Sequence, residues 1–73
     1  MQEFYQNLKN GQRVRTQKKA VLALIERVKT NVIEGRLYFG RGRFYRANWD
    51  TEGNILPNKQ GFGNEFSLLP EFG

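Results

Sequence analysis

The sequence predicts a single small α+β domain, in which one main helix over residues 17–34 packs on a small antiparallel β-meander over residues 36–56. Three observations predict it. Apolar residues recur at helical spacing in the first stretch, aromatic and β-favouring residues separated by glycines fill the second, and glycine and proline interrupt the residues after residue 56. A chain of 73 residues has room for one domain. We place that domain at residues 1–57, with a flexible, acidic, Phe-containing tail at residues 58–73.

The first expected element is a short N-terminal arm or helix. Phe4, Tyr5 and Leu8 stand at positions i, i+1 and i+4, which brings them onto one helical stripe. Gly11 is suited to end such a helix, because glycine adopts the left-handed conformation common at helix C-termini. A helix this short is unstable alone. It must therefore dock, either on the protein's own core or on a partner.

The main helix is expected over residues 17–34. Thr16 is an acceptable N-cap, and Gly35 is suited to the position after the helix. The apolar residues between them follow the helical spacing i, i+3, i+4, i+7 and i+11, and they are Val21, Leu24, Ile25, Val28 and Val32. We therefore expect this helix to supply half of the core.

The meander is expected directly after the helix. Residues 36–39 and 43–49 are rich in β-favouring and aromatic residues, and residues 40–42 form the glycine-containing turn between them. The polar loop at residues 50–54 is a second turn signal. Ile55 and Leu56 make a short third strand, which Pro57 ends. In the tail beyond this strand, Gly61, Gly63 and Pro70 interrupt any regular pattern.

Charge is unevenly distributed along the chain. The protein carries 12 Lys and Arg against 7 Asp and Glu, a formal net charge of +5. Residues 9–46 hold eleven of the bases and only two acids, whereas residues 47–73 hold one base and four acids. A basic body with an acidic tail indicates a polyanion or an acidic protein surface as partner.

The residue types argue against catalysis and metal binding. Cysteine and histidine are both absent, which excludes Ser–His and Cys–His nucleophile systems and leaves zinc only carboxylates to bind. The loop at residues 50–54 lacks the ligand spacing and the closing bidentate Glu of a calcium-binding loop. We therefore expect no enzymatic activity, no metal site and no cofactor.

The sequence also favours a soluble intracellular protein. Its longest apolar run, Ala20–Ile25, is far shorter than the ~20 residues that span a bilayer. The N-terminal residues Met1-Gln2-Glu3-Phe4 lack the basic region and apolar stretch of a secretory signal.

The stretch Gly40-Arg41-Gly42-Arg43-Phe44-Tyr45-Arg46 is the most suggestive motif. Arginines supply phosphate contacts and stacking planes, aromatic rings supply platforms for bases, and glycines allow close approach of a ligand. The motif lacks both the signature of an RNA-recognition motif and the repetition of an RGG segment. Contact with nucleic acid, contact with an acidic protein surface and a plain hairpin with solvated arginines all remain open.

In its length, its lack of cysteine, its basic body and its aromatic arm Glu3-Phe4-Tyr5-Gln6-Asn7-Leu8, the chain resembles the small RNA-polymerase-binding transcription regulator of a lytic Xanthomonas bacteriophage. The resemblance implies binding to host bacterial RNA polymerase at the N-terminal region of the β′ subunit, beside the β flap and the RNA exit channel. It implies inhibition of initiation by displacement of the σ factor, and antitermination with contact to nascent RNA. The protein would act in the bacterial cytoplasm, as a monomer when free.

Residue type and position indicate two groups of partner-binding residues. Phe4, Tyr5 and Leu8 are the candidate apolar anchors. The candidate basic surface consists of Arg13, Arg15, Lys18, Lys19, Arg41, Arg43 and Arg46. Two alternatives to a polymerase regulator remain at this point: a small basic module that binds RNA or single-stranded DNA, and a structural component of a larger particle.

Overall fold

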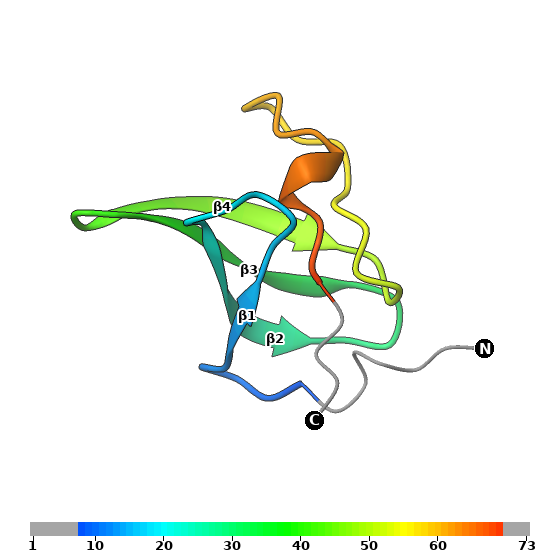
Figure 1. Cartoon of the computed structure of the whole chain (residues 1–73). Helices are drawn as coiled ribbons and strands as arrows, with labels where there is room; N and C mark the ends of the chain where they lie inside the picture. Colours follow the sequence, from blue (N-terminus) through cyan, green and yellow to red (C-terminus); the bar gives the residue numbers. More distant parts are fainter. Residues whose placement is uncertain (1–7, 70–73) are drawn as a thin grey trace.

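A computed structural model describes residues 8–69 and shows a four-stranded antiparallel sheet (Figure 1). The strands follow one another in the order β1-β2-β3-β4, and they are β1 (Arg13–Arg15), β2 (Leu22–Val28), β3 (Ile33–Gly40) and β4 (Arg43–Trp49). A single turn of 3₁₀ helix, η2 (Asn64–Phe66), follows them. Residues 8–69 contain no α-helix, and therefore none that could cross a bilayer. The fold is all-β.

The expected α+β fold is therefore wrong, because residues 17–34 form no helix. They contain a turn, the whole of β2 and the start of β3. Val21, Ala23 and Ile25 are buried while Leu22 and Leu24 are partly exposed, which is the two-residue alternation of a strand. A short apolar run can match helical and strand spacing at once. Here the β-branched residues and the pairing with both neighbouring strands select the strand.

Gly35 does not end a helix but lies inside β3, opposite Ile25. A β-bulge in β2 between Ile25 and Arg27 changes the register at this point. A Cβ atom on residue 35 would collide with the carbonyl oxygen of Leu24. The glycine therefore allows β2 and β3 to approach each other at the bulge.

The first two strands of the expected meander are confirmed, and the third is not. The expected strand at residues 43–49 coincides with β4, and residues 36–39 lie within β3, which begins three residues earlier. The turn between them uses positive φ angles at Gly40, Arg41 and Gly42. Ile55 pairs with Trp49 through an isolated β-bridge rather than a third regular strand.

The chain after β4 closes the sheet into a ring. On one side, Ile55 bridges Trp49 and the Leu56 amide donates to the Asn48 carbonyl at 2.9 Å. On the other side, the segment 67–69 lies along the free edge of β1. The Gln17 amide donates to the Ser67 carbonyl at 3.0 Å, and the Leu69 amide donates to the Arg15 carbonyl at 2.9 Å. Between these contacts, the Leu68 amide donates to the Gly53 carbonyl at 2.8 Å. Both edge strands thus gain a partner.

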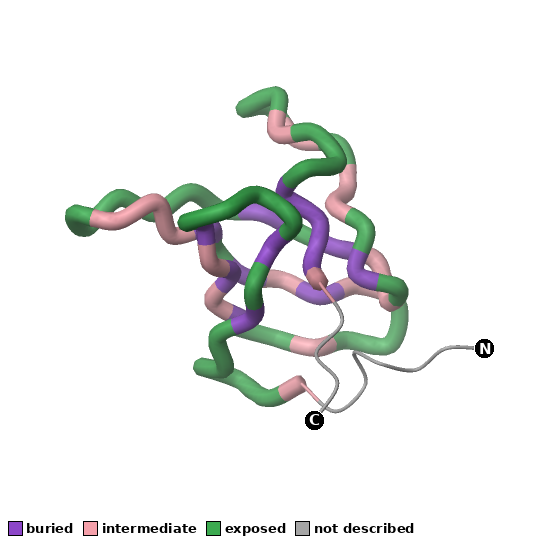
Figure 2. Tube along the Cα trace, in the orientation of Figure 1, coloured by how far each residue is buried: buried purple, intermediate pink, exposed green. Residues whose placement is uncertain are grey.

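The core fills the inside of this ring, where the buried segments of Figure 2 face one another. It consists of Val14, Val21, Ala23, Ile25, Ile33, Leu37, Ala47, Trp49, Phe66 and Leu68. Trp49 is its largest member and is fully buried. Its indole Nε1–H donates to the Phe66 carbonyl at 3.0 Å. This buried hydrogen bond connects β4 to the segment that returns to the sheet at residues 66–69.

Within the described residues, the end of the expected tail packs on the domain, because residues 66–69 return to the sheet. Phe66, Ser67 and Leu68 are buried, and the Ser67 hydroxyl accepts a bond from the Ile55 amide at 3.0 Å. The Phe62 ring lies 5.8 Å from that of Phe39, centroid to centroid. Aromatic burial explains this order, because each such ring removes a large apolar area from water.

Candidate binding surface

The outer face of the sheet, opposite the core, carries a regular array of arginines and apolar residues. Strand register aligns two neighbouring rows across all four strands. Each row begins with an arginine on β1, and its member on β2 is a leucine. We call these eight residues the outer-face patch: Arg13, Leu24, Arg36 and Arg46 in the first row, and Arg15, Leu22, Tyr38 and Phe44 in the second.

Part of this patch borders an open hollow of about 400 Å³ on the outer face. The Tyr38 and Phe44 rings lie 4.9 Å apart at an angle of 35°, and Phe44 retains 40% exposure. The hollow lies between these rings, Leu22, Leu24, Gly42 and the Arg13 side chain. Its size falls within the ~300–1,000 Å³ of ordinary ligand pockets. No acidic residue lines it.

Arg36 connects the two rows. Its guanidinium carbon lies 5.2 Å from the centroid of the Phe44 ring, and its Nε donates to the Glu26 carboxylate at 2.7 Å. A flat cationic group thus already lies over the ring within the protein itself.

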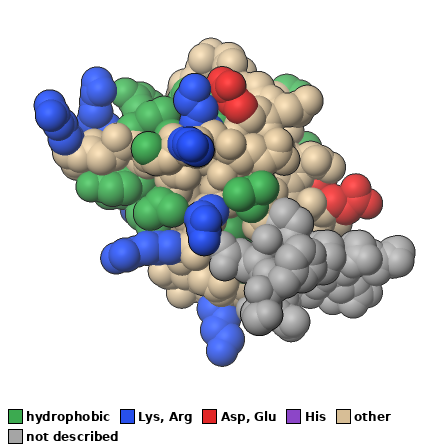
Figure 3. Space-filling model, viewed as in Figure 1, with side chains coloured by type: hydrophobic (Ala, Val, Ile, Leu, Met, Phe, Trp, Pro, Cys, Tyr) green, Lys and Arg blue, Asp and Glu red, His purple; other side chains and the backbone are tan. Residues whose placement is uncertain are grey.

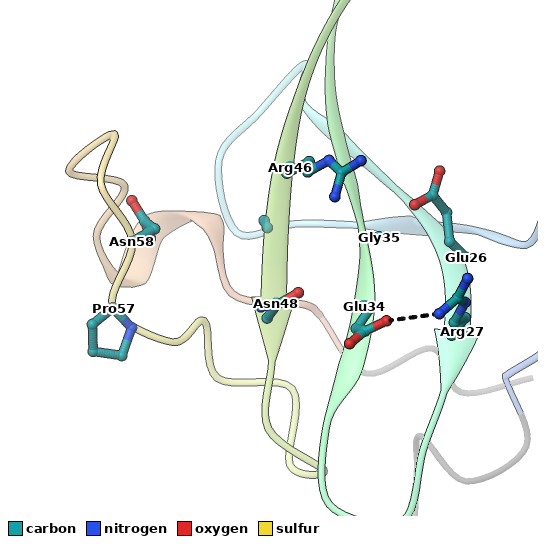
Figure 4. Close-up of a pocket in the computed structure, with 9 residues that line it drawn as sticks. Glu26, Arg27, Glu34, Gly35, Arg46, Asn48, Pro57 and Asn58 are labelled. Carbon is teal, nitrogen blue, oxygen red and sulfur yellow. Dashed lines mark ion pairs between the residues drawn. The ribbon is translucent and has the colours of Figure 1, made fainter.

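A second, more polar hollow of about 650 Å³ adjoins the patch toward the other end of the strands (Figure 4). Glu34 carries two ion pairs there, to Arg27 at 3.9 Å and to Lys29 at 3.3 Å. Glu26, the other carboxylate lining the hollow, pairs with Arg36. Both carboxylates are thus engaged with cations, and the geometry offers no pair of carboxylates poised for acid–base chemistry.

Cations from two separate parts of the sequence meet at one end of the sheet, which we call the basic end. Leu22 pairs with Tyr38 and Tyr38 with Phe44, so the β1–β2 turn and the β3–β4 turn lie at the same end. This end holds Arg15, Lys18, Lys19, Arg41 and Arg43, all exposed and none in an ion pair within residues 8–69. In Figure 3, Lys and Arg side chains project around the protruding β3–β4 hairpin, with hydrophobic side chains between them.

Acidic groups lie mainly at the opposite end of the strands. Ile33 pairs with Trp49, which brings the β2–β3 turn beside the loop at residues 50–54. The Asp50 carboxylate in that loop accepts bonds from the Glu52 and Asn54 amides, each at 2.9 Å. Its oxygens are therefore used to shape the turn. The sheet has one end dominated by cations and one end that carries carboxylates.

The residues expected to bind a partner fall into three groups. Phe4 and Tyr5 lie outside the described residues. Leu8 is partly buried and packs against the protein's own core. The seven expected basic residues are brought together only in part. Arg13, Arg15 and Arg46 belong to the outer-face patch. The other four lie at the basic end: Lys18, Lys19 and Arg41 in its two turns, and Arg43 at the start of β4.

Sequence reasoning missed the apolar and cationic centre of the patch. The helical pattern places Leu22 and Leu24 in a helix, and the hairpin pattern gives Tyr38 and Arg36 no binding role. The alternation of Leu22 and Leu24 with buried Val21, Ala23 and Ile25 is the available signal. It defines an outward face only once residues 22–28 are recognised as a strand.

Within residues 8–69, no group of three acidic, histidine or cysteine side chains is arranged to hold a metal ion. Comparison with protein-family models, with curated proteins and with solved structures finds no match for this chain. Its function must therefore be inferred from its own residues.

Proposed function

We propose that this protein is a phage-type transcription regulator that binds host RNA polymerase, inhibits initiation by displacing the σ factor and promotes antitermination near the RNA exit channel. It acts in the cytoplasm of the bacterial host. The proposed contact is the N-terminal region of the β′ subunit, beside the β flap. This proposal rests on the resemblance in length, basic body and aromatic arm.

The convergence of cations at the basic end is the observation that supports this proposal best. Its four cations at the two hairpin connections are exposed, and none of them forms an ion pair within residues 8–69: Lys18 and Lys19 between β1 and β2, Arg41 between β3 and β4, and Arg43 at the start of β4. A surface of this kind favours association with an acidic partner and accelerates encounter by electrostatic attraction. An acidic surface of a large enzyme provides such a partner.

The proposed activity requires binding alone. Displacement of σ follows if this protein and σ compete for one polymerase surface, because a ligand shifts an equilibrium by its difference in affinity for the two states. A closed sheet with exposed arginines suits that task. The side chains named above need only present charge and shape.

The test is co-elution of the full chain with bacterial RNA polymerase core on size-exclusion chromatography, with and without σ, at moderate salt. We expect the protein to co-elute with core and σ to be released from the holoenzyme. Absence of co-elution with either form would overturn the proposal. So would co-elution with holoenzyme in which σ stays fully bound, because the proposed inhibition depends on its release.

Two pairs of variants locate the contact. Replacing Arg41 and Arg43 with Glu should weaken co-elution. Replacing Lys9 and Lys59 with Glu changes the net charge equally, at two exposed cations that are outside the basic end and form no ion pair within residues 8–69. Replacing Phe4 and Tyr5 with Ala should abolish polymerase binding and leave the circular dichroism spectrum of the sheet unchanged. Equal binding by all variants would contradict both assignments.

A further inference from the structure

We propose that the outer-face patch is a platform for single-stranded nucleic acid, with a base stacked in the hollow beside Tyr38 and Phe44 and phosphates held by the surrounding arginines. The inference goes beyond polymerase binding and does not depend on it. The proposed function would only supply the source of the strand, the nascent RNA.

The hollow has the chemistry of a base-binding site. Two aromatic rings and two leucines are among the residues that line it, and the volume of about 400 Å³ accepts a flat heterocycle. Every base has a π-face, so stacking on such rings is strong and tolerant of sequence. Arg36 shows that a planar group settles over the Phe44 ring, since its guanidinium lies 5.2 Å from the ring centroid.

The arginines are placed where phosphates on either side of a stacked base would lie. Arg13 and Arg15 border the patch on β1, and Arg46 borders it on β4, across the full width of the sheet. None of the three has an ion pair within the described residues. Their guanidinium groups are free to form the paired hydrogen bonds that phosphate oxygens accept.

A nucleic-acid strand fits the patch better than an acidic peptide does. Charge alone would suit either partner, but the positive groups surround two adjoining aromatic rings rather than a purely polar surface. The rows run across four strands, so a ligand lies over the sheet face instead of adding to an edge. Bases splayed over aromatic rings on a four-stranded sheet are a common mode of single-strand recognition.

The test is fluorescence anisotropy of the full chain with labelled oligonucleotides of about 12 nucleotides, within the ~4–16 that small single-strand-binding folds cover. RNA and DNA of the same sequence are compared with a labelled poly-glutamate peptide of equal charge. We expect both strands to bind more tightly than the peptide, and a preference between RNA and DNA identifies the source of the natural strand. Tighter binding of the peptide would overturn the proposal.

Phe44 and Tyr45 offer a matched pair of variants. They are neighbours on β4 with 40% and 39% exposure, but Tyr45 faces the other side of the hairpin and packs on Phe39 and Phe62. Replacing Phe44 with Leu should weaken binding about fivefold or more, the loss expected for one stacked base. Phe44→Trp should preserve binding. Equal losses for Phe44→Leu and Tyr45→Leu would overturn the stacking role.

Salt dependence tests the arginines separately. Each phosphate contact to a single strand adds about 0.7 to the slope of log K against log salt. Replacing Arg13 and Arg46 with Gln should lower that slope by about 1.4, whereas Lys59→Gln, which changes a cation that is not a member of the patch, should leave it unchanged. An unchanged slope in the double variant would overturn their role. These measurements contain no polymerase, so they succeed or fail independently of the co-elution experiment.

Discussion

Replacing Trp49 with Phe should destabilise the protein strongly although the ring stays aromatic. Trp49 is fully buried, and its indole Nε1–H makes the only hydrogen bond to the Phe66 carbonyl within residues 8–69, at 3.0 Å. Phenylalanine removes that donor and leaves a buried carbonyl without a partner, which costs about 1–3 kcal/mol. The smaller ring also leaves a void of about 40 Å³, which adds about 1 kcal/mol at ~24 cal/mol per Å³.

The expected total is therefore about 2–4 kcal/mol of the roughly 4–11 kcal/mol that a domain of this size possesses. The melting temperature should fall on the order of 10–30 °C, since each kcal/mol shifts it by about 4–8 °C in small domains. Circular dichroism during thermal and urea denaturation measures both quantities without needing the lost fluorophore.

Tyr45→Phe is the matched control. It removes one polar atom from an aromatic residue of the same strand, but that hydroxyl makes no hydrogen bond within residues 8–69, and the residue is 39% exposed. Its free energy of unfolding should change by less than about 0.5 kcal/mol. A loss that small for Trp49→Phe would refute the inference that the indole holds the returning segment to the sheet.

Three further substitutions test local features of the fold. Gly35→Ala should cost about 1–3 kcal/mol, because the added Cβ meets the backbone of β2, and a urea midpoint equal to that of the parent would contradict this. Ala20→Gly should raise the melting temperature measured by calorimetry, because Ala20 has a φ angle of 69° and a left-handed alanine costs about 1–2 kcal/mol. A lower melting temperature for the variant would show that the turn is unstrained. Glu26→Gln should change stability by less than about 1 kcal/mol, since its pair with Arg36 is nearly half exposed. A larger loss on denaturation would mean that this pair holds the sheet together.

Local patterns predicted the second half of the sheet and failed in the first half. Residues 43–49 combine aromatic side chains with a glycine turn before them, and no helical pattern competes there. Residues 21–28 instead place Leu22 and Leu24 on the outside of a strand. The run is therefore apolar on both faces and also fits a helical stripe. The outer-face patch could not be predicted without recognising that strand, because the centre of the patch includes Leu22 and Leu24.

Closure of the ring could not be predicted from local pattern at all. Thr16 and Leu68 meet through an isolated bridge although they lie far apart in the sequence. Each segment is short, and nothing in either indicates its partner. The glycines and the proline in residues 57–63 indicate a break in regular structure. That pattern does not distinguish a chain that is mobile afterwards from one that returns to the sheet. Only the three-dimensional structure, in which Phe66 and Leu68 are buried, shows that the chain returns to the sheet.

The closed ring also governs how copies of this protein meet one another. An unpaired strand edge invites another chain to add to the sheet and seed aggregates. Segment 67–69 covers β1, and Ile55 and Leu56 cover the end of β4, so residues 43–46 at the hairpin are the stretch of β4 to which no further strand of the described chain pairs. Arg43 and Arg46 lie on that stretch, where a second copy would bring identical positive charges against them. The residues placed to attract an anionic partner therefore also discourage self-association.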